Sequence, residues 1–356
     1  MMPLMIYGAN GYTGKLIVAE AVKRGMRPVL AGRNRDALDE LAAPHKLTRR
    51  VFELHDGNVI DRNMDGMQLL LNCAGPFART CEPLLEACLR NKVHYLDITG
   101  EIDVFERCHH SHPRAQHESV VVLPGTGFDV VPTDCLAAML KQRLPDASHL
   151  MLAFDAGGGP SPGTARTSVE GLAKGGRARI NGELASVPLA WKVREFTRAD
   201  GTGRVAMSIP WGDVYTAFVS TGIANIETYM TAPPKTITRL RWLNHLRWLL
   251  RMQVVQKFLQ NRAGQTAGPD AARRRRSGCQ IWGEVRNAAG RRESLSMLTP
   301  NGYELTVTAS LGIVQHLLAT PVAGGYYTPS KLMGMDYVLG LPGVKLLPDA
   351  GAVAAS

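Results

Sequence analysis

Short apolar runs alternate with longer amphipathic segments through the first 145 residues of the chain. The runs are apolar at nearly every position, which is typical of strands buried on both faces of a parallel sheet. The segments between them repeat their apolar residues at helical spacing, as helices that cover such a sheet do. The predicted strands are 4–7, 28–31, 50–54, 69–72, 93–96 and 120–123, and the predicted helices are 12–24, 36–42, 82–90, 103–116 and 131–143.

The pattern changes after residue 150, where the apolar segments become short and β-rich. Strands are predicted at 151–155, 191–196, 204–209, 216–220, 225–230, 283–288, 293–298 and 303–309, and helices at 165–174 and 311–319. The sequence therefore predicts an α/β fold in which an N-terminal Rossmann-type parallel sheet precedes a second α+β domain with a mainly antiparallel sheet. The expected boundaries are 1–128 for the first domain, 129–325 for the second, and 326–356 for a C-terminal segment that folds back towards the first.

Three glycines separate the first predicted strand from the first predicted helix. Gly8, Gly11 and Gly14 would allow a tight turn, the approach of a pyrophosphate to the backbone, and close packing of the helix on the strand. The free N–H groups and the dipole at the start of the helix favour a phosphate there. The spacing differs from the usual G-x-G-x-x-G, and a glycine turn without a ligand is the alternative, but the strand–turn–helix context favours a dinucleotide.

Two arginines follow the second predicted strand, where a dinucleotide fold contacts the adenosine ribose. An acidic residue at this place would bind the 2′-hydroxyl of NAD, whereas Arg33 and Arg35 suit the 2′-phosphate of NADP. The alternative is that both arginines are solvated beside a helix that Asn34 caps. The pattern therefore predicts NADP(H) as the cofactor.

Ligands of open α/β sheets bind outside the carboxyl ends of the strands, so the loops at those ends are candidate cofactor contacts. Ala74, Gly75 and Pro76 follow the strand at 69–72, and we expect Phe77 to lie near the nicotinamide. The full set of expected cofactor contacts is Gly8, Asn10, Gly11, Tyr12, Thr13, Gly14, Arg33, Asn34, Arg35, Cys73, Ala74, Gly75, Pro76, Phe77 and Gly100.

Two residues are candidates for a catalytic proton donor. Asp129 follows the strand at 120–123, although a carboxylate beside a helix N-terminus, like that of Asp134, is often only a cap. Tyr327 precedes Lys331 at the Y-x-x-x-K spacing of short-chain dehydrogenases, but it lies almost at the end of the chain. Tyr327 would donate a proton only if the C-terminal segment folds back over the cofactor.

Four motifs stand in order along this part of the chain: Gly8-x-x-Gly11-Tyr12-Thr13-Gly14, Asn72-Cys73-Ala74-Gly75-Pro76-Phe77, His94-Tyr95-Leu96-Asp97-x-Thr99-Gly100-Glu101 and Gly127-Phe128-Asp129-x-x-Pro132-x-Asp134. Together they resemble the saccharopine dehydrogenase-like oxidoreductases, specifically the branch that contains trans-acting enoyl reductases. Saccharopine-forming enzymes carry Asp-Pro-Gly after the last Rossmann strand. This chain has Phe-Asp-Val-Val-Pro at 128–132, which argues against amino-acid imine substrates.

The resemblance implies an NADPH-dependent reductase that transfers hydride to an activated double bond, with an enoyl thioester or polyketide-type substrate, small or carrier-bound. Two alternatives stay open. One is an imine or aldehyde reductase on the same fold, and the other is a non-catalytic NADP-binding sensor or scaffold. The second domain of related enzymes usually pairs subunits, so a homodimer is expected.

The composition adds little chemistry beyond this cofactor site. The six cysteines form no C-x-x-C pair, and the histidines of 108–117 lack a zinc pattern, so no metal is predicted. The arginine run 273–276 has no accompanying aromatic residues, so nucleic acid is not an expected partner. The chain shows no secretory signal and no run of about 18 apolar residues, which favours a cytoplasmic protein.

The net charge of +10 is concentrated in one amphipathic segment. Leucines recur at helical spacing through 238–262, and arginines and two tryptophans, Trp242 and Trp248, lie among them. Such a basic helix can rest on an anionic membrane surface or dock an acidic acyl carrier. The alternative is a helix that packs on its own domain with a solvated basic face. A position peripheral to the inner face of a membrane is therefore a second expectation.

Overall fold

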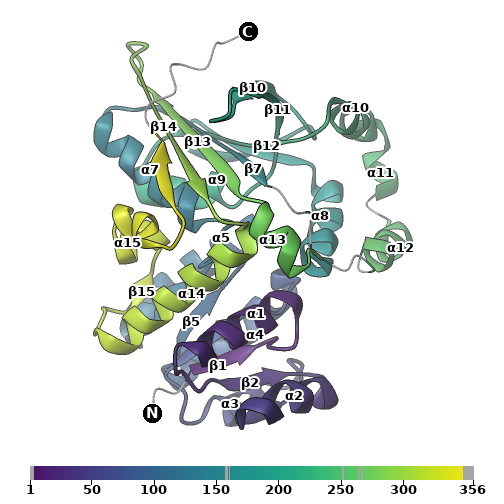
Figure 1. Ribbon diagram of the computed structural model, residues 1–356, viewed down its shortest axis with the longest axis vertical. Coiled ribbons are helices and arrows are strands. Elements are labelled where there is room, and N and C mark those ends of the chain that lie inside the picture. Colours follow the sequence, from purple (N-terminus) through teal and green to yellow (C-terminus); the bar gives the residue numbers. More distant parts are fainter. Residues whose placement is uncertain are drawn as a thin grey trace. The chain divides into compact units, whose positions relative to one another are not determined.

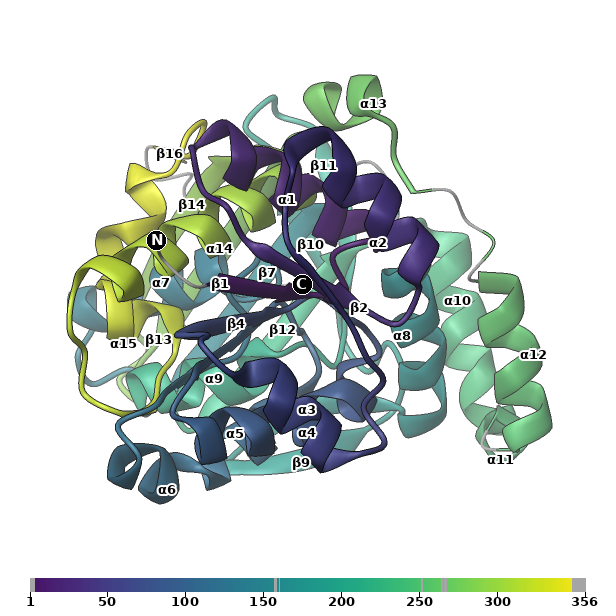
Figure 2. The same cartoon turned by 90° about the horizontal axis from the view of Figure 1, so that it is seen from below.

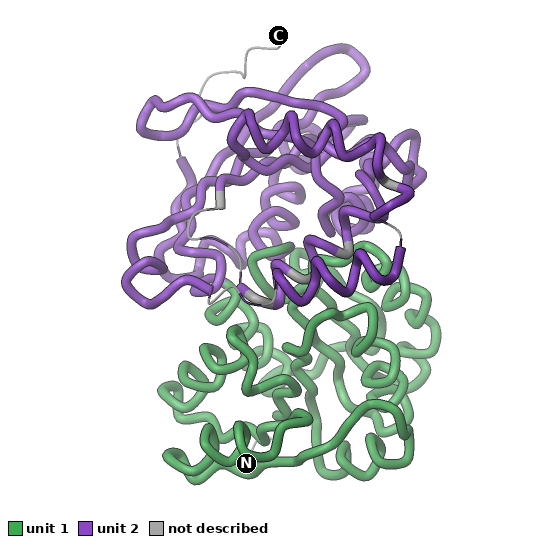
Figure 3. The backbone as a smooth tube through the Cα atoms, turned by 90° about the vertical axis from the view of Figure 1, so that its right-hand side faces the viewer, with its two compact units in different colours: residues 1–129, 306–332 green, residues 130–305, 333–356 purple. Residues whose placement is uncertain are grey.

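The protein is described by a computed structural model that covers residues 4–347, apart from residues 157, 158, 160, 251, 264, 266 and 267. The chain divides into two compact units (Figure 3). The first comprises residues 1–129 and 306–332, and the second comprises residues 130–305 and 333–356. The return of the chain to the first unit thus begins at residue 306, earlier than the expected boundary at 326.

Within the described residues, the first unit contains a seven-stranded parallel sheet in the order β15-β6-β5-β4-β1-β2-β3. Its strands are β1 (Leu4–Tyr7), β2 (Val29–Gly32), β3 (Arg49–Val51), β4 (Leu69–Asn72), β5 (His94–Asp97), β6 (Val121–Leu123) and β15 (Gly325–Tyr326). Strands β1 and β4 are buried at every position, as their unbroken apolar runs predict. The strand order reverses between β1 and β4, where open α/β sheets bind their ligands.

Helices cover both faces of this sheet. Figure 2 shows α1, α2 and α14 on one face and α3, α4 and α5 on the other. The helices are α1 (Tyr12–Lys23), α2 (Arg35–Ala42), α3 (Gly57–Met64), α4 (Phe77–Asn91), α5 (Ile102–His110), α6 (His112–His117) and α14 (Gly302–Ala319), with a 3-10 turn at Ala43–His45. The Rossmann-type parallel sheet predicted from the sequence is confirmed.

The strand predicted at 303–309 is wrong, because these residues form the first half of α14. The alternation of β-branched and polar residues is typical of a strand, but in the structure the polar residues Thr306 and Ser310 lie one turn apart on the same face of a helix. The Thr306 hydroxyl accepts from the Phe128 N–H at 2.9 Å, and Ser310, one turn later, donates to the Thr126 carbonyl at 3.1 Å. Buried apolar residues such as Leu305, Val307 and Leu311 are spread around the rest of the helix, which hides the helical period.

The second unit contains a mainly antiparallel sheet. Within the described residues, its order is β10-β11-β12-β7-β13-β14-β16, and β8 pairs with β12 and β9. The strands are β7 (His149–Ala156), β8 (Gly176–Ile180), β9 (Glu183–Val187), β10 (Val193–Thr197), β11 (Gly203–Ser208), β12 (Asn225–Thr231), β13 (Cys279–Arg286), β14 (Arg292–Thr299) and β16 (Lys345–Leu347). Strands β7 and β12 run parallel, whereas the other pairs are antiparallel, as predicted.

Figure 1 labels the helices of the second unit. They are α7 (Val131–Arg143), α8 (Pro162–Lys174), α9 (Asp213–Thr221), α10 (Pro234–Leu243), α11 (Arg247–Leu250), α12 (Gln253–Ala263) and α13 (Ala271–Arg276), and α15 (Pro329–Met333) spans the boundary between the units. A side chain at Gly283 of β13 would meet Leu140 of α7 at 2.6 Å, so α7 lies directly on the sheet.

The strand predicted at 216–220 is also wrong. Residues 213–221 form α9, which ends at Gly222 in the left-handed conformation. The segment is rich in aromatic and β-branched residues, so its composition favours a strand, whereas in the structure it is a helix that is buried on most sides of its first turns.

The polar contact of α14 yields a testable consequence for the first unit. Thr306→Val keeps the shape of the side chain but removes the acceptor of the buried Phe128 N–H, so we expect a loss of about 1–3 kcal/mol in the free energy of unfolding. Urea denaturation followed by circular dichroism measures it. Thr236→Val, at an exposed threonine, is the control. Equal stability of the two variants would contradict the packing assigned to α14.

Candidate functional site

The turn between β1 and α1 brings the backbone of three segments together. Gly8 has φ of +79°, and a side chain there would place its Cβ 2.8 Å from the Ala74 nitrogen. A Cβ at Gly14 would lie 2.3 Å from the Gly8 carbonyl oxygen. Both positions therefore require glycine for the packing of the chain itself, whether or not a ligand binds.

Gly11 is different from the other two glycines. Its φ is −70°, and a Cβ there would meet only the Gly8 carbonyl oxygen, at 3.2 Å. Gly11 is also the N-cap of α1, where it forms no side-chain capping bond, and the first turn of the helix contains no acidic residue. The space beside Gly11 and the positive end of α1 therefore fit a phosphate group, and the predicted pyrophosphate site is consistent with the geometry.

The end of β2 presents the two predicted arginines to solvent. Arg33 and Arg35 are both exposed. Asn34 caps α2, since its side-chain oxygen accepts from the Ala37 N–H at 3.1 Å. Burial raises the pKa of Tyr7 to about 12, and the positive charge of Arg33 acts against this rise, so Arg33 acts electrostatically on the end of β1. The capping role of Asn34 and a phosphate-binding role of Arg33 are compatible.

The loop after β4 is held by side-chain hydrogen bonds. The Asn72 side chain accepts from the Ala74 N–H at 3.0 Å and donates to the Thr80 hydroxyl at 3.0 Å. The Thr80 hydroxyl in turn donates to the Ala74 carbonyl at 2.7 Å. These bonds fix the loop in the position that places Ala74 beside Gly8.

Glu101 connects the loops that follow β4 and β5. Its two carboxylate oxygens accept from the Phe77 and Ala78 N–H groups, each at 2.9 Å. These groups lie at the start of α4, so the carboxylate satisfies donors that the helix leaves open. Sequence reasoning missed this role of Glu101, although the residue stands within the quoted Asp97–Glu101 motif.

Asp97, at the end of β5, fixes the next pair of loops. Its carboxylate accepts from the Tyr95 hydroxyl at 2.9 Å, the Thr99 N–H at 3.0 Å and the Gly125 N–H at 2.9 Å. Burial raises the pKa of Asp97 to about 6, whereas these hydrogen bonds act to lower it. The sequence analysis did not single out Asp97. The signal in the sequence was a carboxylate at the end of an otherwise apolar strand, because a buried carboxylate needs hydrogen-bond donors around it.

Asp129 lies at the end of this row of loops. A Cβ at Gly100 would be 2.9 Å from a carboxylate oxygen of Asp129, so the absence of a side chain at Gly100 makes room for that group. Burial raises the pKa of Asp129 to about 7. Close contacts thus connect Gly8 with Ala74, Phe77 with Glu101, and Gly100 with Asp129 along the carboxyl edge of the sheet.

Tyr327 lies elsewhere in the first unit. Its N–H donates to the Val122 carbonyl at 2.9 Å, beside β6. Its hydroxyl donates to the Ala323 carbonyl at 3.0 Å, before the start of β15. Because β15 runs parallel to β6, this hydroxyl points towards the amino edge of the sheet. The geometry therefore favours Asp129 over Tyr327 as a proton donor.

The remaining polar clusters have structural partners. His112 accepts from the Tyr326 N–H at 2.9 Å, and the His109 ring stacks on Tyr326 at 4.7 Å between centroids, so these histidines attach α5 and α6 to β15. The Ser220 hydroxyl donates to Asp134 within the second unit. The Cys81, Asp97 and Cys108 ligand atoms lie within 4.8 Å of one another, but Asp97 already accepts three hydrogen bonds.

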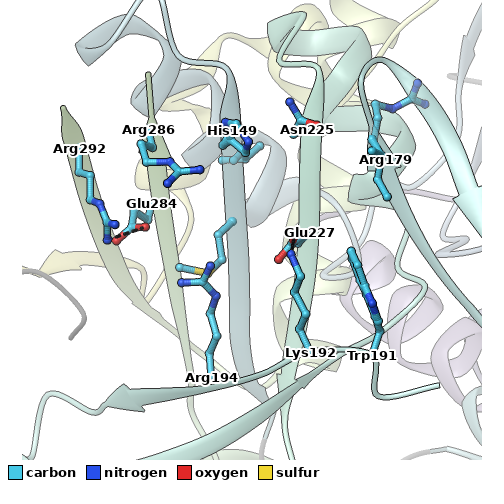
Figure 4. Close-up of a pocket in the computed structure, with 13 residues that line it drawn as sticks. His149, Arg179, Trp191, Lys192, Arg194, Asn225, Glu227, Glu284, Arg286 and Arg292 are labelled. Atoms are coloured by element: carbon cyan, nitrogen blue, oxygen red, sulfur yellow. Dashed lines mark hydrogen bonds and ion pairs between the residues drawn. The ribbon is translucent and has the colours of Figure 1, made fainter. Parts of the chain in front are cut away.

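The second unit contains a separate charged pocket of about 380 Å³ (Figure 4). Its lining comes from distant parts of the sequence, so no local motif predicted it. Lys192 pairs with Glu227, and Arg292 lies 3.7 Å from Glu284. The Arg179 guanidinium stacks over Phe218. Much of the charge is therefore paired within the pocket, and we assign it no catalytic role.

The parallel sheet, the glycine turn and the open start of α1 together define the first unit as a dinucleotide-binding domain. Residues 4–123 match the family model of the saccharopine dehydrogenase NADP binding domain. For this part of the chain the match confirms the resemblance seen in the four motifs, and the cofactor is NADP(H).

Curated relatives share this part of the chain. The chain is 33% identical over 148 residues to a probable mitochondrial saccharopine dehydrogenase-like oxidoreductase of Arabidopsis thaliana. It is 28% identical over 152 residues to a trans-acting enoyl reductase of Mycobacterium leprae. These matches cover 37% and 40% of this chain but only 33% and 36% of the relatives, about a third of their length.

Solved structures share the fold at low identity. Apo saccharopine dehydrogenase (L-Glu forming) from Saccharomyces cerevisiae gives a TM-score of 0.64 at 10% identity, over 98% of this chain and 100% of that chain. A homospermidine synthase from Legionella pneumophila, in complex with NAD, gives 0.65 at 9% identity, over 97% and 91%. Identities this low show a common fold alone.

The contrast among the three glycines can be tested by substitution. Gly11→Val should leave the fold intact but weaken NADPH binding by at least about a hundredfold, roughly 2.7 kcal/mol, because the side chain occupies the place of the pyrophosphate. Isothermal titration calorimetry measures the affinity. Gly57→Val, at the start of α3, is a matched control that should bind normally. An unchanged affinity for the Gly11 variant would place the dinucleotide elsewhere.

The choice between NADPH and NADH tests the role of Arg33. Wild type should bind NADPH at least about tenfold more tightly, equivalent to about 1.4 kcal/mol, and Arg33→Ala should lose this preference because the 2′-phosphate loses a charged partner. Titration of both cofactors against wild type, Arg33→Ala and the exposed control Arg62→Ala makes the comparison. If Arg33→Ala weakened the binding of NADH as much as that of NADPH, Arg33 would act on the fold and not on the 2′-phosphate.

Proposed function

We propose that the protein is an NADPH-dependent reductase that transfers hydride to an activated carbon–carbon double bond, with an enoyl thioester or polyketide-type substrate, small or carrier-bound. The observation that carries the proposal is the position of Asp129. Its carboxyl group, with a pKa of about 7, lies at the same edge of the sheet as the glycine turn. A general acid is most effective when its pKa is near the working pH.

The residues of the chain would divide the work as follows. Gly8 to Gly14 hold the pyrophosphate, Arg33 contacts the 2′-phosphate, and the loop of Ala74 to Phe77 lies along the cofactor. The bound NADPH supplies a hydride from its nicotinamide ring. The proton that completes the reduction of the double bond comes from the Asp129 carboxyl. Although burial raises its pKa, Asp129 retains some exposure to solvent, which would return the proton after each turnover.

The support for an enoyl substrate is the similarity to trans-acting enoyl reductases of Mycobacterium leprae and Mycobacterium ulcerans. The similarity to saccharopine dehydrogenase-like oxidoreductases supports the alternative, an imine or aldehyde reductase. An acid with a pKa near 7 would serve either reaction, because both end with protonation of a product atom. A non-catalytic sensor or scaffold has no use for such an acid, which favours an enzyme.

The proton-donor role predicts a definite dependence on pH. Asp129 must be protonated to donate, so kcat/KM with an enoyl thioester should fall as the pH rises through about 7. Asp129→Asn cannot donate and should lower kcat by about 10²-fold or more while the NADPH affinity stays the same. Initial rates of NADPH oxidation from pH 5 to 9, about two units on either side of the pKa of Asp129, give kcat/KM and kcat.

Asp65→Asn, at an exposed carboxylate of the same unit, is the control for the loss of one negative charge. It should retain the wild-type profile. If Asp129→Asn keeps both the rate and the fall in rate near pH 7, another group is the donor. If no unsaturated thioester, imine or aldehyde is reduced although NADPH binds, the sensor or scaffold is the better assignment.

A further inference from the structure

Large apolar side chains emerge from one part of the second unit. Among the described residues, seven large apolar side chains are exposed by more than a third, and five of them lie between residues 242 and 258. These five are Trp242 at 61%, Trp248 at 67%, Met252 at 47%, Val254 at 76% and Phe258 at 62%. Single exposed apolar residues are ordinary on a protein surface, whereas a cluster of this kind marks a place of interaction.

The same helices have a strongly one-sided charge. Residues 234–263 contain seven lysines and arginines and no aspartate or glutamate. Five of these basic residues are exposed, namely Lys235, Arg239, Arg241, Lys257 and Arg262. Arg241 also donates to the Ala190 carbonyl at 3.0 Å, and residue 251 and the side chain of Arg247 lie outside the described residues. The exposed cations therefore have no acidic neighbour on their own helices.

The apolar residues are exposed although the helices are attached to the unit. Ile237 and Leu250 are buried. The Asn244 side chain accepts from the Leu189 N–H at 2.8 Å and donates to the Leu189 carbonyl at 3.0 Å. The Gln256 amide donates to the Val169 carbonyl of α8 at 3.4 Å. One side of α10–α12 is thus fixed on the unit, while the tryptophans, Val254 and Phe258 are presented outward.

We propose that α10–α12 form a docking surface for an anionic lipid bilayer. Tryptophan, phenylalanine and valine side chains enter the boundary between headgroups and acyl chains, and the exposed lysines and arginines contact lipid phosphates. A continuous negative surface suits a stretch of cations that has no acidic residue, whereas a protein partner usually requires charges of both signs. No helix in the described parts of the chain has the length and apolar character needed to cross a bilayer.

Flotation with lipid vesicles tests this assignment on the full chain. Wild type should float with vesicles of phosphatidylcholine and phosphatidylglycerol at low salt, and high salt or pure phosphatidylcholine should release it. Replacement of Lys235, Arg239, Lys257 and Arg262 by Gln should weaken binding by about tenfold or more. Trp242→Ser with Trp248→Ser should weaken it at least as strongly. Binding should also shift the tryptophan emission to shorter wavelength in wild type but not in a Trp242→Phe, Trp248→Phe variant that still floats.

Matched controls separate this surface from general effects. Ile180→Ser and Leu346→Ser remove exposed apolar side chains elsewhere, and Lys46→Gln and Lys345→Gln remove exposed charges elsewhere. These variants should float like wild type. NADPH affinity should be normal in every variant, because none of the substitutions is in the cofactor site, so the result is independent of the proposed reductase activity.

Two results would overturn the proposal. One is wild type that stays in the soluble fraction at low salt with anionic vesicles. The other is a Trp242→Ser, Trp248→Ser variant that floats like wild type but no longer binds an acidic acyl carrier, or no longer dimerises in analytical ultracentrifugation as wild type does. That outcome would assign the surface to a protein partner or to a second copy of the chain.

Discussion

The close approach of the β1–α1 turn to the loop after β4 is the constraint on which the dinucleotide site depends. Gly8 allows it, since a Cβ there would lie 2.8 Å from the Ala74 nitrogen, and Gly14 lets α1 pack on the turn, since a Cβ there would lie 2.3 Å from the Gly8 carbonyl oxygen. This packing sets the start of α1 at the point where the strand order reverses. Gly11, where a Cβ would meet only the Gly8 carbonyl oxygen, at 3.2 Å, then leaves the helix N-terminus open to a phosphate. The three glycines thus have separate physical roles.

Polar groups at the strand ends extend this arrangement across the sheet. Asn72, Asp97 and Glu101 each accept hydrogen bonds from backbone N–H groups of the loops at the strand ends. Their hydrogen bonds fix the loops that follow β4, β5 and β6 in one row. Asp129 stands at the end of that row, where burial makes its carboxyl harder to ionise. In the proposed function, the same loops would hold the cofactor and position the acid.

The sequence predicted the parallel sheet, the glycine turn and most strand positions, because buried parallel strands and glycine turns leave strong local patterns. It failed at 216–220 and 303–309, where β-rich helices are buried on most sides and lose their amphipathic period. It also missed Asp97 and Glu101, because their partners are distant in the chain. The single helix expected over 238–262 is instead α10, α11 and α12 with a 3-10 turn at Asn244–Leu246, since Asn244 binds Leu189 there.

Transfer of isotope from the cofactor tests the proposed reductase most directly. In two separate reactions, the purified protein would be given an enoyl thioester and NADPH deuterated on one or the other face of nicotinamide C4. The product would be analysed by mass spectrometry. The account predicts a saturated thioester that carries deuterium from one of the two labelled faces and a solvent proton on the neighbouring carbon. NADPH that binds but transfers no deuterium from either face to any unsaturated thioester would contradict it.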